Sequence, residues 1–133
     1  MYKLKQLADS LASKLLPLAI RNQSFFVNEI SKDISIDSNN ESLTSVMSGL
    51  LAAVVRHAKD TCIRLTAKTN GGIVVFEIKE SGCISSYAMA CGLQDVQSMA
   101  EKIGGNLSIS IGKTGSTTIA FSFPNMPVPT QIH

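Results

Sequence analysis

The chain has 133 residues, of which 44% are hydrophobic and 17% charged, and its formal net charge is +2. This length suits one domain with its own hydrophobic core, and the composition argues against a disordered chain. The Lys and Arg residues are scattered singly, so the chain lacks the basic stripe of a nucleic-acid-binding protein. It also lacks the run of about 18 apolar residues that a membrane span requires. We therefore expect neither nucleic acid nor a membrane as a partner.

The three cysteines are Cys62, Cys83 and Cys91, an odd number without the spacing of a zinc site. The N-terminus carries polar residues in place of the apolar stretch of a secretory signal. We expect a reduced, cytoplasmic protein, in which Cys83 and Cys91 remain thiols rather than forming a disulfide.

The first quarter of the chain changes from a helical to an extended pattern. Apolar residues at helical spacing from Leu4 to Leu16 predict a helix that ends at Pro17. Aromatic and β-branched residues predict a strand over 24–30, and a short extended piece over 34–36 follows.

The clearest predicted element is a central helix. Eight apolar residues recur at helical spacing between Leu43 and Ala58, so we expect this face to pack on a sheet. The polar cluster 37–40 predicts a turn, and one of its residues or Ser42 is expected to cap the helix.

Two hairpins and a third helix complete the pattern. The expected elements are strands over 63–67 and 73–78 joined by Asn70–Gly72, a helix from Leu93 to Ile103 stopped by Gly104 and Gly105 in a left-handed conformation, and strands over 107–111 and 119–123. This order predicts an α/β (α+β) two-layer sandwich, with three helices on one face of a mixed, mainly antiparallel sheet. We expect a single domain over 1–124 and a disordered tail over 125–133.

The C-terminal third carries the most specific sequence motifs. Gly92-Leu93, the run Met99–Ile109 with its Gly104-Gly105 pair, and the closing segment Ser116–Pro124 stand in that order. Together they resemble the last glycine box, helix and closing strands of the histidine kinase ATP-binding domain, in the GHKL superfamily with the Bergerat fold. The resemblance extends from about Leu4 to Pro124 and implies this fold. It also implies that Gly92, Leu93 and Thr117 are candidate nucleotide-binding residues.

The central helix corresponds, by this resemblance, to the family's asparagine box. The two asparagine positions are occupied by Gly49 and Ala53, and only Arg56 keeps its expected basic character. Magnesium requires oxygen ligands, which glycine and alanine side chains cannot supply. His57, on the same helix, is expected to be a solvent-facing residue rather than a phosphoacceptor.

The family's adenine-binding Asp-x-Gly-x-Gly box corresponds to the segment beginning at Glu80. Glu80 stands at the aspartate position, Gly82 is kept, and Ile84 replaces the second glycine. The lid that follows in the family is reduced to 85–91. A glutamate can still accept a hydrogen bond from an adenine amine, but its carboxylate is displaced by one methylene, which is a serious misplacement in a preformed site.

Three functions therefore stay open. The first is a stand-alone, non-catalytic relative (a pseudokinase) that acts in signal transduction through a protein partner, or as a homodimer paired through the leucine-rich N-terminal helix. The second is a weak ATP or ADP binder that uses Glu80, Gly82 and Gly92. The third is a pocket repurposed for another small ligand, with room left by Gly49 and Ala53.

No catalytic residue and no metal site is expected under the first of these functions. ATP or ADP is a cofactor only under the second, and magnesium is not expected to accompany it. Because the chain starts at Met1 directly on the first helix of the domain, we expect no phosphoacceptor helix pair. Met1 and the tail favour a short full-length protein over a trimmed piece of a longer one, and both alternatives stay open.

Overall fold

The computed structural model describes residues 2–36, 41–81, 92–112 and 116–125. Its helices are α1 (Leu4–Lys14), α2 (Leu16–Arg21), α3 (Glu41–His57) and α5 (Gln94–Lys102). Its longer strands are β2 (Phe25–Asn28), β4 (Cys62–Asn70), β5 (Ile73–Glu80), β6 (Asn106–Ile111) and β7 (Thr117–Pro124). Two short strands, β1 (Tyr2–Lys3) and β3 (Ser35–Ile36), pair antiparallel with each other.

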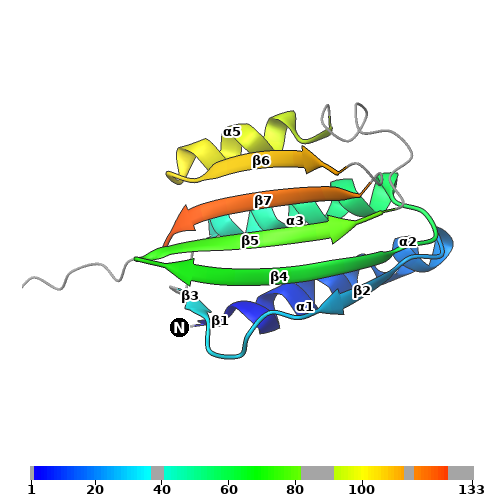
Figure 1. The fold of residues 1–133 in the computed structure, drawn as a ribbon, viewed down its shortest axis with the longest axis horizontal. Helices are drawn as coiled ribbons and strands as arrows, with labels where there is room; N and C mark the ends of the chain where they lie inside the picture. Colours follow the sequence, from blue (N-terminus) through cyan, green and yellow to red (C-terminus); the bar gives the residue numbers. More distant parts are fainter. Residues whose placement is uncertain (1, 37–40, 82–91, 113–115, 126–133) are drawn as a thin grey trace, which may run out of the picture.

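The five longer strands form one sheet in the order β2-β4-β5-β7-β6 (Figure 1). The pairing of β2 with β4 is parallel, and the other three pairings are antiparallel. The long helix α3 lies across one face of this sheet (Figure 1). The predicted mixed, mainly antiparallel sheet in a two-layer α/β fold is confirmed.

The core lies between the sheet and the helix layer. Alternate residues of β5 and β7 point into it, and Phe76 pairs with Phe121 across the two strands, both fully buried. The apolar stripe of α3 covers them, and Met47, Leu50 and Val54 are each fully buried. Burial of each such side chain contributes about 1.5–3 kcal/mol, so this contact accounts for much of the stability.

Pro17 does not end the helical region, so this part of the prediction is wrong. It lies in the first turn of α2, a fourth helix that follows α1 after Leu15. Proline fits there because the N–H groups of a first helical turn have no partner within the helix. Two of the N-terminal leucines, Leu4 and Leu11, are buried in the core of the same chain, and dimer pairing through the remaining leucines stays a prediction.

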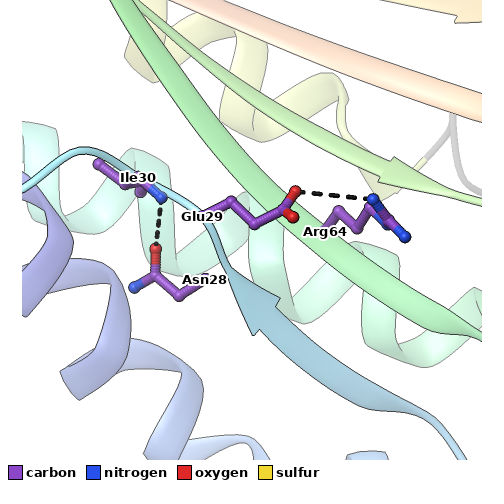
Figure 2. Close-up of polar contacts among 4 residues, drawn as sticks. All are labelled: Asn28, Glu29, Ile30 and Arg64. Carbon is purple, nitrogen blue, oxygen red and sulfur yellow. Dashed lines mark hydrogen bonds and ion pairs between the residues drawn. The ribbon is translucent and has the colours of Figure 1, made fainter.

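The edge strand β2 is held by side-chain contacts at its C-terminal end (Figure 2). The Asn28 Oδ1 atom accepts a hydrogen bond from the Ile30 N–H at 3.1 Å, while its Nδ2 donates to Asp9 Oδ1 at 2.7 Å. Glu29 forms an ion pair with Arg64 of β4 at 3.8 Å. Both of these side chains are exposed, so the pair contributes less than about 1 kcal/mol.

The predicted turn at Asn70–Gly72 is confirmed, and of the glycine pair after α5 Gly104 is left-handed whereas Gly105 is not. Gly71 and Gly72 join β4 to β5 with φ of 57° and 86°, and Gly104 ends α5 with φ of 78°. Beyond β7, Asn125 donates from its N–H to Gly72 O at 2.8 Å and from Nδ2 to Ser35 O at 2.7 Å. The rest of the predicted tail, 126–133, lies outside the described residues. In the parts of the chain that are described, no helix has the length and apolar character needed to cross a bilayer.

Candidate functional site

Four elements that carry candidate residues meet at one end of the sheet. The C-terminal end of α3, the start of α5, the end of β5 and the start of β7 all lie on the same side in Figure 1. Because α3 and α5 pack against each other, residues from distant parts of the sequence come together here.

Glu80 and Thr117 form the polar centre of this end. They are directly opposite each other in the register of β5 and β7, and both side chains belong to the rows that face the core. Their exposed fractions are 4% and 2%. A carboxyl group and a hydroxyl group are thus held side by side in the interior, where polar groups require hydrogen-bond partners.

The hydroxyl of Thr117 has an unusual environment. Its Oγ1 atom is buried, and no hydrogen-bond partner for it exists among the residues that the structure describes. A buried polar atom left without a partner costs about 1–3 kcal/mol, so such an atom is a natural contact for a ligand.

A second polar pair fixes the end of β5 beside Glu80. The Ser81 N–H donates to Thr61 Oγ1 at 3.3 Å, and the two hydroxyl oxygens are 3.4 Å apart. Thr61 precedes β4 and is buried. This contact joins Ser81, the first residue after β5, to Thr61, which precedes the neighbouring strand β4. It therefore restricts the backbone next to Glu80.

The α3 side of the site is closed by a side chain from α5. A Cβ atom placed on Gly49 would lie 2.8 Å from Cγ2 of Val96, closer than carbon atoms normally approach. Ala53, one turn later, is buried with an exposed fraction of 4%. Among the described residues, the flank of α3 at Gly49 therefore packs against Val96 of α5.

The remaining candidates lie around this packed centre. Arg56 is exposed at the end of α3. Gly92 is also exposed, and a Cβ atom placed on it would lie 3.8 Å from His57 Nε2, so the end of α3 and the start of α5 are adjacent. The side chain of Leu93 is buried in the core. Gly82 lies outside the described residues, together with Ile84, the shortened lid over 85–91, and the two cysteines Cys83 and Cys91.

These residues do not suit a magnesium ion. No group of three or more His, Cys, Asp and Glu side chains among the described residues could hold a metal. Gly49 and Ala53 offer no oxygen, and the space beside Gly49 is filled by Val96. Glu80 offers carboxyl oxygens and Thr117 a hydroxyl, which together suit a ligand group that forms hydrogen bonds.

Two features of the site were missed in the sequence. Val96 lies within the predicted helix from Leu93 to Ile103, but nothing in the sequence pattern shows that it packs on Gly49. A glycine in the middle of a strongly helical segment was the available signal, since it often marks a close approach between elements. Thr61 gave no signal, because its role depends on the pairing of β4 with β5.

Comparison with solved structures identifies the fold. The histidine kinase AdeS of Acinetobacter baumannii matches with a TM-score of 0.79 at 9% identity, over 93% of this chain and 66% of that one. The nucleotide-free catalytic domain of the histidine kinase ThkA matches with a TM-score of 0.76 at 13% identity, over 93% of both chains. ThkA in complex with the response regulator TrrA matches with a TM-score of 0.74 at 14% identity, over 94% of this chain and 41% of that one.

No protein-family model and no curated protein sequence matches the chain. At these identities the structural matches establish the fold alone. The chain has the histidine kinase ATPase fold, as the resemblance of its C-terminal motifs predicted.

Proposed function

We propose that this chain is a non-catalytic interaction or regulatory module of a signal-transduction system, built on the histidine kinase ATPase fold. The observation that carries the proposal is the contact between Gly49 and Val96. It replaces oxygen-bearing side chains with apolar packing at the place where the resemblance puts the magnesium ligands.

A charged ligand placed beside Gly49 and Ala53 would lose hydration without gaining new ligands. Magnesium requires near-octahedral oxygen ligands, and a cation or a triphosphate moved into an apolar environment without them loses its hydration. Gly49, Ala53 and Val96 supply no compensating group. Arg56 remains available at the end of α3, but as an exposed charge it offers a solvent-screened contact only.

The partner that we propose is a protein. Support comes from the solved complex of ThkA with the response regulator TrrA, in which a kinase that shares this fold is bound to a signalling protein. We place the chain in the cytoplasm by analogy with the histidine kinase QseC, whose matching solved part is a cytoplasmic segment.

A second candidate function is the binding of ATP, ADP or another small ligand without magnesium. The buried Oγ1 atom of Thr117 beside Glu80 favours it, because a ligand that hydrogen-bonds to both would satisfy that hydroxyl. Substituting Thr117→Val removes this hydrogen bond and leaves the shape almost unchanged. Magnesium-independent binding of ADP that this substitution weakens about tenfold would support the second candidate.

The non-catalytic proposal is tested by incubating the protein with ATP and magnesium. We expect phosphate release no faster than in buffer and no phosphorylated protein. The Arg56→Ala variant serves as a control for contaminating ATPases, because a contaminant's activity is unaffected by it. Turnover that falls in both Arg56→Ala and Glu80→Ala proteins would contradict the proposal.

A further inference from the structure

Three of the five large hydrophobic side chains that are exposed among the described residues lie at one corner of the molecule. Leu16 and Ile20 on α2 are 47% and 64% exposed, and Phe25 at the start of β2 is 55% exposed. Figure 1 shows α2 beside the start of β2. We name these three residues the corner patch. Their concentration within ten residues of sequence distinguishes them from single exposed apolar residues, which are normal on any surface.

Local geometry turns the corner patch outward. Leu16 and Ile20 are four residues apart and therefore lie on the same face of α2. Ala19 is fully buried on the core side of that helix. The Ser24 N–H donates to Ala19 O at 2.8 Å, which brings Phe25 next to the end of α2.

The backbone beneath the corner patch is braced on α3 and on the start of β4. Asn22 Nδ2 donates to Val55 O at 2.7 Å, and the Asp60 N–H donates to Asn22 O at 2.9 Å. The hydroxyl of Ser24 donates to Ala58 O at 3.3 Å. These apolar side chains are thus presented on a fixed support, which reduces the entropy that is lost when a partner binds.

The charges around the corner patch favour an acidic partner over a second copy of the chain. From Lys14 to Asn28 the chain contains two cations, Lys14 and Arg21, both exposed, and no acidic residue. The adjacent exposed residues Lys59 and Asp60 offset each other. A second copy of the chain would bring like charges together across a two-fold axis, whereas an acidic partner would be attracted.

We propose that the corner patch docks an amphipathic helix of a partner protein, with an apolar face flanked by acidic residues. This inference rests on the proposed function, because an interaction module needs a docking surface. The ridge of Leu16 and Ile20 packs into the groove between side-chain rows of the partner helix. Phe25 supplies an aromatic anchor, and Arg21 faces the acidic flank.

A lipid bilayer suits the corner patch less well than a protein. Helices that lie in a membrane interface have an extended apolar face and a polar face rich in Lys and Arg. α2 has six residues, and the stretch around it carries only two cations.

The test uses the full chain and a synthetic peptide of about 18 residues, or five helical turns. The peptide carries leucines along one helical face and glutamates on both flanks, and a scrambled peptide of identical composition is the reference. Binding is followed by fluorescence anisotropy for the wild-type, Ile20→Glu and Arg21→Glu proteins. Ile73→Glu is the matched control, because Ile73 is 47% exposed and is the first residue of β5. The start of β5 lies at the opposite end of the sheet from α2 (Figure 1).

We expect the wild-type protein to bind the amphipathic peptide at least about tenfold more tightly than the scrambled one, a preference that is carried by the helical face. Ile20→Glu and Arg21→Glu should each lower that affinity about tenfold, and Ile73→Glu should leave it unchanged. Circular dichroism establishes that the variants are folded, and Phe25→Ser replaces any variant that is not.

Equal affinity for both peptides, or equal losses in Ile20→Glu and Ile73→Glu, would overturn the inference. So would a wild-type dimer in sedimentation that Ile20→Glu converts to a monomer, since the occupant would then be a second copy. Binding to phosphatidylserine vesicles that Ile20→Glu abolishes would assign the corner patch to a membrane instead. ATP turnover with intact peptide binding would refute the proposed function alone, which keeps the two failures distinguishable.

Discussion

At the scale of single residues, the effect of substituting Gly49 tests most directly whether α5 packs against α3 at the candidate site. In a solvated helix, replacing glycine with alanine gains about 1 kcal/mol because the backbone loses less entropy on folding. At Gly49 the added methyl group would meet Val96 Cγ2 at 2.8 Å, and a valine on a helix has one strongly preferred rotamer. The usual gain should therefore be reversed.

We expect Gly49→Ala to lower the free energy of unfolding by about 1 kcal/mol, because overpacking costs more than the helix propensity returns. The measurement is urea denaturation. In a Val96→Ala background the same substitution should become stabilising by about 0.5 kcal/mol or more, because the space is then available. An unchanged effect of Gly49→Ala in that background would show that Val96 does not close the site.

Thr117 is the second informative residue, because its buried hydroxyl has no partner in the described part of the chain. We expect Thr117→Val to raise the free energy of unfolding by about 1 kcal/mol in the absence of ligand, since it removes an unsatisfied polar atom. The neighbouring Thr118→Val is the control. Its side chain is half-buried on the other face of the sheet, and its effect should stay within about 0.5 kcal/mol. A loss of stability in Thr117→Val would mean that the hydroxyl is already satisfied.

At the scale of elements, the strongly periodic segments were predictable, whereas the short helix α2 and the pairing of the shortest strands were not. The apolar stripe from Leu43 to Ala58 predicted α3, and the Asn70–Gly72 turn predicted the β4–β5 hairpin, because local spacing alone determines both. α2 was missed since Pro17 is compatible either with the end of one helix or with the first turn of the next. Pairing of β1 with β3 could not be predicted, because it joins two-residue strands that are distant in the sequence.

The end of α5 offers a direct test of an element boundary. Gly104 has φ of 78°, a conformation that costs an L-residue about 1–2 kcal/mol, so Gly104→Ala should lower the free energy of unfolding by about 1 kcal/mol. Gly92→Ala, two residues before the same helix, is the control. A methyl group there makes only an ordinary contact with His57 at 3.8 Å and should change stability by less than about 0.5 kcal/mol. Similar losses for both substitutions would argue against the left-handed helix end.

At the scale of the whole molecule, the fold was more predictable than the site. The order of helices and hairpins and the motifs from Gly92 to Pro124 indicated the histidine kinase ATPase fold, which the solved structures confirm. The sequence alone showed that Gly49 and Ala53 stand at the positions of the family's two asparagines. The packing of Val96 on Gly49 and the alignment of Glu80 with Thr117 were not, because both depend on how distant elements approach one another in three dimensions.

The proposed non-catalytic function requires that the packed flank of α3 exclude nucleotide in its magnesium-bound form. The most direct measurement is calorimetric titration of the folded protein with ATP, with and without magnesium. We expect no magnesium-dependent heat of binding at millimolar ATP, because Gly49 and Ala53 provide no ligand for the ion. Magnesium-dependent binding at micromolar ATP would contradict the account, since it would require the α3–α5 contact to open and other residues to hold the metal.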